Sequence, residues 1–365
     1  MKLDFLNRKK EIIKLNMTLS GKGKFVVIYG RRRCGKSRLI KSVKSDNDIY
    51  YQAIQADPVL QIESFVQEVK RIYRGFDAVR YPNWESVFIN IEKYAKGKIN
   101  IFIDEFTYLA ESDSSFPSVL QKYLDNRINS NINLIVSGSS QRMMHNTVLN
   151  SNSPLYGRAD ARLKIKPLNP GYLLEALKLD PISAVEYYSV FDGIPRYWEL
   201  AGDYTNIKDA AKELLLDVDG ILHDEVKKLL LDELRTAEQP FSILHVIGQK
   251  NHTLSSIAKR LEKKETSLSR PLAILIDLGY INREIKFLSN AKKRTGNLYK
   301  FNDLLFKFYF RFVQPHISLL EQDMVEQTWN SIQPEFNLHI SETWEELARK
   351  SVPSLYLYDL EWGPA

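Results

Sequence analysis

The chain has 365 residues, of which 44% are hydrophobic and 26% are charged, and it carries a net charge of +6. This is the composition of a globular protein, and the length favours two or three domains. No apolar run is long enough to cross a bilayer, and no apolar secretion signal follows Met1, so we expect a cytoplasmic protein without a membrane partner. The lone cysteine rules out an intrachain disulfide and thiol-rich zinc sites.

The first strong pattern is a strand that leads into a glycine-rich loop. Residues 25–29, FVVIY, are typical of a strand buried on both faces. Residues 30–37, GRRRCGKS, match the pattern GxxxxGKS/T, and a helix-forming segment follows. The glycines let successive N–H groups point at phosphate oxygens, and the N-terminus of the helix adds positive potential. This order predicts a P-loop, which binds the phosphates of a nucleotide.

The residues of this loop have expected roles. Lys36 is expected to bridge the outer phosphates during catalysis, and the hydroxyl of Ser37 to ligate Mg²⁺. The other expected nucleotide contacts of the loop are Gly30, Arg33, Cys34, Gly35 and Arg38. Residues 1–45 hold 14 basic and 2 acidic residues, and phosphate binding can account for this local excess.

A second predicted strand, residues 99–103, ends in two adjacent carboxylates. Downstream of a P-loop, this arrangement resembles a Walker B element. Asp104 would hold Mg²⁺ through water, and Glu105 would orient and deprotonate the attacking water. The adjacent carboxylate is a mark of the NTPase division that includes AAA+ and STAND proteins.

A third predicted strand, residues 132–136, runs into the sequence SGSS. In that NTPase division, the strand after Walker B lies between the Walker A and Walker B strands, and its polar end senses the γ-phosphate. We expect Ser139 to be this catalytic sensor, with Ser137 and Ser140 as alternatives. A serine-rich turn without such a role is the competing interpretation.

Several segments together resemble the archaeal-type ATPases of the STAND/AAA+ neighbourhood. Besides the P-loop, they are FLNRKKE at 5–11, FIDEF at 102–106, GSS at 138–140, SPLYGR at 153–158 and GIPRY at 193–197. Asp192 replaces the first glycine of the family's GGIPxY segment. The resemblance extends to about residue 350, and it implies an ATPase that uses ATP and Mg²⁺.

The resemblance also assigns roles to two arginines. Arg8 would lie close to the adenine, and Arg158 would stand where related ATPases place an arginine that reaches the γ-phosphate. Each has a simpler interpretation. Arg158 would be an ordinary surface or salt-bridged arginine, and Arg8 and Glu11 would face solvent beside an amphipathic helix.

The predicted fold is α/β, with a P-loop NTPase core of the ASCE/AAA+ type in residues 1–167. Its parallel sheet would be covered by helices at residues 58–73, 81–96, 116–127 and 172–177, with a further strand at 49–54. Residues 168–238 are predicted to form a helical lid that packs over the nucleotide.

Residues 239–303 resemble a winged helix-turn-helix domain. Helices are expected at residues 243–247, 254–261 and 268–278, and a hairpin wing at 280–300. Pro271 conflicts with an uninterrupted third helix, which should begin near Ser269 or bend. Residues 254–300 hold 11 basic and 4 acidic residues, and Lys292, Lys293 and Arg294 of the wing would meet DNA phosphates. Winged domains also contact proteins, which is the alternative here.

Residues 304–365 resemble the start of the family's C-terminal nuclease-like domain, with a helix at 329–349. The strand that would carry further acidic residues and a catalytic lysine is missing from the sequence, so we expect no nuclease activity. The leading hypothesis is a slow, Mg²⁺-dependent ATPase that acts as a switch on DNA or a protein partner. The alternatives are a DNA-binding regulator with negligible turnover and a STAND-type scaffold that forms homo-oligomers.

Overall fold

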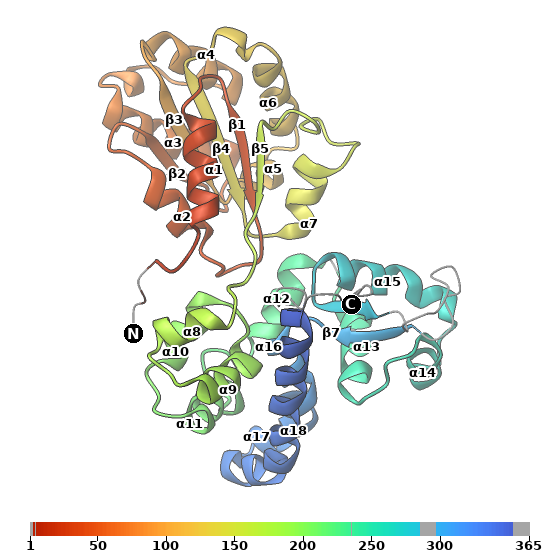
Figure 1. Ribbon diagram of the computed structural model, residues 1–365. Coiled ribbons are helices and arrows are strands. Elements are labelled where there is room, and N and C mark those ends of the chain that lie inside the picture. Colours follow the sequence, from red (N-terminus) through yellow and green to blue (C-terminus); the bar gives the residue numbers. More distant parts are fainter. Residues whose placement is uncertain (1–2, 4, 235, 285–296, 353–365) are drawn as a thin grey trace, which may run out of the picture. The chain divides into compact units, whose positions relative to one another are not determined.

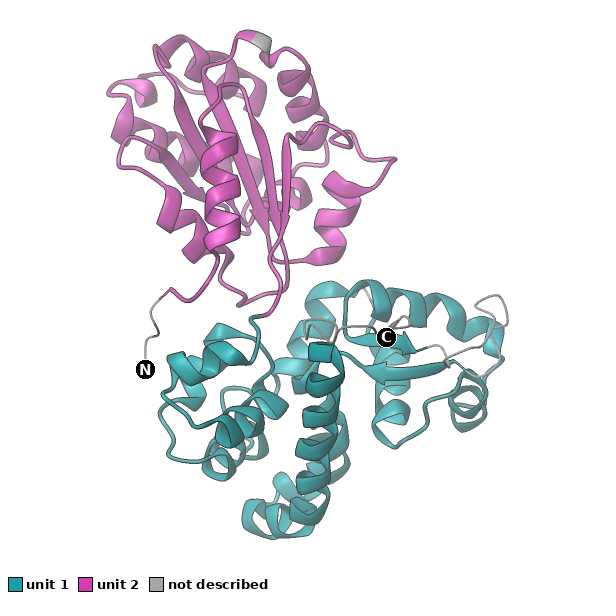
Figure 2. Ribbon diagram, viewed as in Figure 1, with its two compact units in different colours: residues 1–4, 168–365 teal, residues 5–167 magenta. Residues whose placement is uncertain are grey.

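The computed structural model describes residues 3, 5–234, 236–284 and 297–352 (Figure 1). The chain divides into two compact units, of which one is Phe5–Pro167 and the other runs from Leu168 onward and includes Leu3 (Figure 2). The predicted wing residues Lys292, Lys293 and Arg294 lie outside the described residues. Within the described part, no helix combines the length and the hydrophobicity needed to cross a bilayer.

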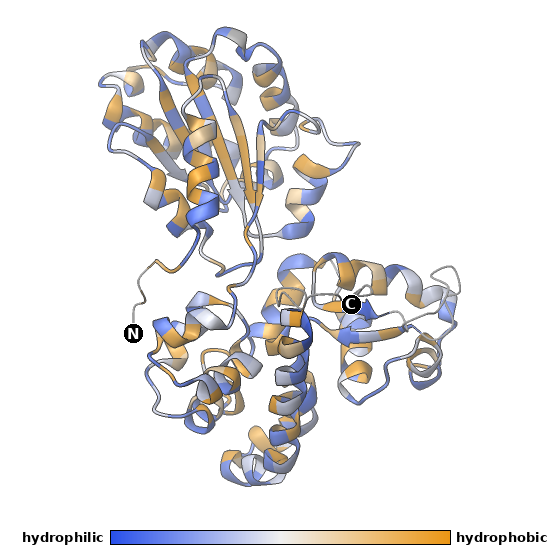
Figure 3. Cartoon of the chain, viewed as in Figure 1, coloured by the Kyte–Doolittle hydropathy of each residue, from blue (hydrophilic) through white to orange (hydrophobic). Residues whose placement is uncertain are grey.

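The first unit, Phe5–Pro167, is built on a five-stranded sheet in which every neighbouring pair of strands is parallel. The strand order is β2-β3-β4-β1-β5. The strands are β1 (Phe25–Tyr29), β2 (Ile49–Gln52), β3 (Ile99–Asp104), β4 (Ile132–Gly138) and β5 (Ala161–Lys164). The three central strands are almost wholly buried on both faces, which explains their continuous apolar sequences (Figure 3). This confirms the predicted α/β fold.

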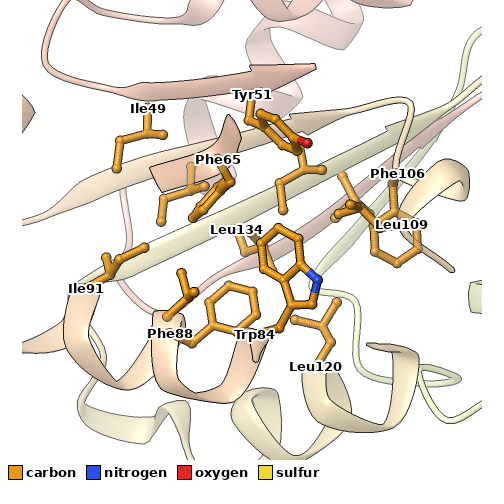
Figure 4. Close-up of a cluster of buried hydrophobic side chains, with 14 of the residues drawn as sticks. Ile49, Tyr51, Phe65, Trp84, Phe88, Ile91, Phe106, Leu109, Leu120 and Leu134 are labelled. Atoms are coloured by element: carbon orange, nitrogen blue, oxygen red, sulfur yellow. The ribbon is translucent and has the colours of Figure 1, made fainter. Parts of the chain in front are cut away.

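Helices cover both faces of this sheet. They are α1 (Lys9–Leu19), α2 (Lys36–Val43), α3 (Pro58–Ile72), α4 (Trp84–Tyr94), α5 (Thr107–Ser112), α6 (Phe116–Asp125) and α7 (Gln141–Met144). A large hydrophobic core lies between the sheet and helices α3, α4 and α6, where their aromatic side chains meet (Figure 4). The ring of Trp84 lies 5.3 Å from that of Phe65 and 5.0 Å from that of Phe116. Burial of these large rings supplies much of the stability of the unit.

Polar side chains hold the amino ends of the strands in register. Asp48 accepts hydrogen bonds from the backbone and side chain of Asn100 on β3. Asn133 on β4 is fully buried, and it donates to Asn100 and to the carbonyl of Gly21. A buried polar group costs free energy unless it is paired, so this network favours one strand register. This network lies at the amino ends of the strands. The candidate functional site lies at their carboxyl ends.

The second unit, from Leu168 onward, is mainly helical. Its helices are α8 (Gly171–Ala176), α9 (Pro181–Phe191), α10 (Pro195–Ala201), α11 (Ile207–Ala211), α12 (Glu225–Glu233), α13 (Glu238–Gly248), α14 (Leu254–Arg260), α15 (Glu265–Asp277), α16 (Leu304–Phe308), α17 (Ile317–Leu320) and α18 (Val325–Ser351). Strands β6 (Ile281–Glu284) and β7 (Leu298–Phe301) form an antiparallel pair. Three helices followed by two antiparallel strands have the order of a winged helix-turn-helix, and that identification stays a prediction, as do the lid and its boundaries.

Two sequence-based expectations are wrong. The helix expected at residues 172–177 is not part of the unit that contains the sheet, because α8 belongs to the second unit, where Leu173 is fully buried. For the third helix of the expected winged domain, the alternative of a start near Ser269 is wrong, and the alternative of a bend stays a prediction. The helix begins at Glu265 and contains Pro271 in its interior, where the ring removes one N–H donor.

Asp192 stands at the position where the resemblance described above implies a glycine. It ends α9 with φ at 51°, a backbone conformation that favours glycine. Its carboxylate accepts hydrogen bonds from the N–H of Gly193 at 2.6 Å and from the N–H of Leu304 at 3.3 Å. The side chain therefore offsets the backbone strain and ties the end of α9 to the start of α16.

Candidate functional site

The P-loop lies between β1 and α2, and its backbone has the required positive φ angles. Gly30 has φ at 152°, and a Cβ atom there would stand 2.3 Å from the carbonyl oxygen of Ile165. Gly35 has φ at 94° and precedes the first residue of α2. Lys36 is 5% exposed, and its Nζ donates to the carbonyls of Gly30 at 2.9 Å and Arg31 at 3.1 Å. Only glycine fits the first position without moving the strand end opposite it.

The other predicted loop residues have different surroundings. Arg33 has φ at 67°, which is uncommon for a residue with a side chain. Cys34 is fully buried, which fits packing of the loop better than a contact through sulfur. The guanidinium of Arg38 lies over the ring of Phe5, 5.9 Å from its centroid. Ser37 is the second residue of α2, and a helix N-terminus favours bound anions because its free N–H groups point outward.

Asp104 lies at the end of β3 and is 1% exposed. Its Oδ1 accepts hydrogen bonds from the hydroxyl of Ser137 and from the N–H of Glu105 at 3.1 Å. Its Oδ2 accepts from the hydroxyl of Tyr50 at 3.0 Å. Three hydrogen-bond donors hold this buried carboxylate in one orientation.

Glu105 and Ser139 are in direct contact. The Oε2 of Glu105 accepts from the hydroxyl of Ser139 at 2.8 Å and from its N–H at 3.3 Å. Glu105 itself has φ at 54°, and non-glycine residues in this region are concentrated at functional sites. The three candidate serines therefore have distinct partners, because Ser137 donates to Asp104 and Ser140 caps α7 by accepting from the N–H of Met143.

Arg8 lies close to the P-loop. It is 4% exposed, and its Nη2 donates to the carbonyls of Cys34 at 3.0 Å and Lys166 at 2.8 Å. Its Nη1 donates to Glu11 at 3.4 Å. The alternative in which Arg8 faces solvent is therefore wrong, since the guanidinium joins the loop to the segment that follows β5. A contact with adenine stays a prediction.

Arg158 is not brought to the P-loop. Its Nε and Nη2 donate to Asp125 at 2.7 and 3.0 Å, and this hydrogen bond holds the pKa of the Asp125 carboxyl below its usual value. Arg158 comes shortly before β5, and the first residue of β5, Ala161, pairs with Val26 near the start of β1. Arg158 therefore lies at the edge of the sheet where the amino ends of the strands meet. A five-residue strand spans roughly 16 Å, which separates this edge from the loop that follows β1.

Tyr50 is a site residue that the sequence did not indicate. Burial and the neighbouring charge of Asp104 raise the pKa of its hydroxyl, so it stays a donor at ordinary pH. The ring lies beside the ammonium of Lys41, 5.7 Å from the ring centroid. In the sequence, only the alternation of side chains along a strand bears on Tyr50. It requires Tyr50 and Tyr51 to point to opposite faces of the sheet, but it does not identify Asp104 as the partner.

The oxygen ligands at this edge suit Mg²⁺. Within the described residues, no three acidic, histidine or cysteine side chains cluster in a way that would hold a metal alone. One carboxylate, Asp104, and one hydroxyl, Ser37, match the few protein ligands that Mg²⁺ takes when phosphates supply the others. The donor set therefore fits a metal that binds together with a nucleotide.

Comparisons with known proteins agree with this geometry. A family model described as an ATPase domain predominantly from Archaea matches residues 5–200. Another, of archaeal and bacterial proteins of unknown function, matches residues 309–359. An uncharacterized protein of Methanocaldococcus jannaschii is 33% identical over 352 residues, which are 95% of this chain and 76% of that protein.

Two solved structures share the fold. A Walker-type ATPase of Pyrococcus abyssi superimposes with a TM-score of 0.66 at 20% identity, over 84% of this chain and 96% of that one. The ORC2 protein of Aeropyrum pernix, solved as ADPNP–ADP complexes, has a TM-score of 0.55 at 17% identity, over 88% of this chain and 96% of that one. At these identities the likeness concerns the fold alone.

Proposed function

Because the chain belongs to the family of ATPase domains found predominantly in Archaea, as its motifs predicted, we propose that it hydrolyses ATP with Mg²⁺ and acts as a molecular switch. The observation that carries this proposal is the convergence of Asp104, Glu105 and Ser139 at the sheet edge where the P-loop begins. We expect slow turnover, as suits a switch whose two states must persist.

The residues have separate roles in this proposal. Lys36 and the loop amides bind the phosphates, and Ser37 and Asp104 hold Mg²⁺, which offsets phosphate charge when bound. Glu105 orients the attacking water and accepts its proton, while Ser139 fixes the position of the Glu105 carboxylate. Because Ser139 contacts Glu105, a hydrogen bond between the serine hydroxyl and the γ-phosphate would change the position of the Glu105 carboxylate and so the rate of hydrolysis.

The path from nucleotide to switch is supported by contacts behind the P-loop. Gly30 packs against the backbone of Ile165, and Arg8 joins the carbonyls of Cys34 and Lys166. Lys166 is followed by Pro167, the last residue of the first unit. A loop that moves when phosphates bind would therefore shift the segment from which the second unit continues.

Two substitutions test the proposed function. Lys36→Ala should abolish binding of a fluorescent ATP analogue, because the ammonium that meets the outer phosphates is gone. Glu105→Gln should bind the analogue as wild type does but lose hydrolysis by about a hundredfold or more. Equal binding and turnover by wild type and Lys36→Ala protein would defeat the proposal.

Self-assembly is a second candidate, favoured by the position of Arg158. An arginine at the edge opposite its own P-loop cannot meet the nucleotide of the same chain in this conformation. We infer that it acts in the site of a second copy, where a cation beside the γ-phosphate would stabilise the transition state. A mass that does not change with ATP, measured by light scattering, would count against this candidate.

Binding of duplex DNA is favoured by exposed basic residues at α14 and α15. They are Lys259, Arg260, Lys263, Lys264 and Arg270. These would supply phosphate contacts in addition to those expected from Lys292, Lys293 and Arg294, which lie outside the described residues. Affinity for duplex DNA that falls steeply with salt, and falls further when the three wing residues are neutralised, would support this role.

A further inference from the structure

Tyr50 is the sole described donor to one oxygen of the predicted metal carboxylate. Its hydroxyl lies 3.0 Å from Oδ2 of Asp104, whereas Ser137 and Glu105 both donate to Oδ1. Asp104 is 1% exposed, so water cannot fully replace the hydrogen bond from Tyr50 if that hydroxyl is removed. The orientation of the carboxylate therefore depends on this hydroxyl more than on any other single group at Oδ2.

The ring of Tyr50 also connects two elements of the site. It lies 5.7 Å from the ammonium of Lys41, which belongs to α2, the helix that begins with Lys36 and Ser37. Its hydroxyl reaches Asp104 at the end of β3. One side chain thus spans the helix that carries the predicted metal hydroxyl and the strand that carries the metal carboxylate.

The adjacent Tyr51 provides an internal comparison. It points to the opposite face of the sheet, where its hydroxyl donates to Oε1 of Gln61 at 2.6 Å and its ring packs against Phe65. Tyr51 is buried and Tyr50 is half-buried, and each hydroxyl donates one hydrogen bond to a side chain, Gln61 for Tyr51 and Asp104 for Tyr50. Only Tyr50 contacts a site residue, so an effect on metal binding should be confined to it.

We propose that Tyr50 is a positioning residue for the magnesium site, in which its hydroxyl sets the orientation of the Asp104 carboxylate toward the metal. This inference rests on the proposed function, since it requires Asp104 to hold Mg²⁺. Groups that hydrogen-bond a metal ligand from behind fix its geometry, and their loss typically weakens metal binding by about 10- to 100-fold. Tyr50 would act through Asp104 and not through a contact of its own with the reacting phosphate.

The test is Tyr50→Phe, which keeps the ring and its contact with Lys41 but removes the hydroxyl. We would titrate Mg²⁺ into the full chain with a fluorescent ATP analogue and record the concentration that gives half-maximal binding. The concentration should rise about tenfold in Tyr50→Phe protein and change less than about twofold in Tyr51→Phe protein. Binding of Mn²⁺ to the protein–nucleotide complex, followed by electron paramagnetic resonance, should weaken in parallel.

Lys41→Met gives a second test, because this side chain is exposed and its loss leaves the core intact. It should raise the Mg²⁺ requirement in the same direction by about two- to fivefold, the range of one cation–π contact. An unchanged Mg²⁺ requirement in both Tyr50→Phe and Lys41→Met proteins would overturn the inference. Wild-type protein whose nucleotide binding ignores Mg²⁺ altogether would instead defeat the proposed function.

Discussion

At the scale of single residues, the contact between Glu105 and Ser139 favours Ser139 over Ser137 and Ser140 as the serine with the largest effect on hydrolysis. Ser139 is the one whose hydroxyl and N–H both meet the predicted catalytic carboxylate. Ser139→Ala should therefore lower kcat by at least about tenfold while the affinity for nucleotide stays within about twofold. Single-turnover hydrolysis and equilibrium binding separate these two quantities.

Ser140→Ala is the matched control for that prediction, because its hydroxyl caps α7 by accepting from the N–H of Met143. It should lower stability by about 1 kcal/mol, the usual effect of losing a helix cap, without the same loss in kcat. If the two alanine variants hydrolyse ATP equally fast, Ser139 has no role in sensing or orientation.

Some residues of the candidate site could be predicted from sequence patterns, and others could not. The P-loop and the Asp104–Glu105 pair were predictable, because strand, loop and carboxylate follow one another within short segments. Tyr50 was not, since its partner Asp104 is supplied by another strand and only the register Gln52 to Asp104 brings them close. A salt bridge at Arg158 was one of two alternatives from the sequence. Its partner, Asp125, was not predicted, because no local pattern identifies it.

At the scale of elements, Arg8 joins the N-terminal segment, the P-loop and the end of the first unit. Arg8→Lys should destabilise the protein by about 2 kcal/mol, because a lysine cannot reproduce both bonds of Nη2 to buried carbonyls. It should also reduce the difference in amide exchange that ATP produces in residues 164–176. Glu11→Gln, which changes only the partner of Nη1, serves as the control in the same exchange experiment.

The long helix α18 contains a pH-sensitive contact. His339 is fully buried, and its Nε2 donates to the carbonyl of Ser189 on α9, while Nδ1 has no partner among the described residues. Burial lowers the pKa of His339 to about 3. Because the folded pKa lies below the unfolded value of about 6.5, protonation favours the unfolded chain, and stability falls as pH drops from 6.5 toward 3.

Between pH 6.5 and pH 5 this histidine should reduce the free energy of unfolding by up to about 2 kcal/mol. His339→Gln cannot take up this proton, so its unfolding temperature should decline less than that of wild type over the same interval. Scanning calorimetry at the two pH values checks the difference. Parallel declines in both proteins would mean that other groups control the acid sensitivity.

At the scale of the whole molecule, the main question is whether hydrolysis needs more than one copy. The site of one chain has its P-loop, Asp104 and Glu105 at the carboxyl edge of the sheet, whereas Arg158 pairs with Asp125 at the amino edge. A carboxylate partner keeps the guanidinium ordered, and phosphate of higher charge would be a stronger partner when a second copy presents it. In the head-to-tail assembly that we propose, the arginine at one edge would face the phosphate site at the other edge of a second copy.

Mixing two inactive variants tests this arrangement directly. Arg158→Ala protein keeps its own Lys36 and Glu105, and Glu105→Gln protein keeps its arginine, so each should hydrolyse ATP at least about tenfold more slowly than wild type when alone. In a mixture, the arginine of the Glu105→Gln copy would complete the site of the Arg158→Ala copy, and part of the activity should return in proportion to the number of mixed contacts. The recovery should depend on protein concentration, because the contact is intermolecular. Activity that stays at the sum of the two separate proteins, at concentrations where the mass shows assembly, would confine Arg158 to its ion pair with Asp125 and return hydrolysis to the single chain.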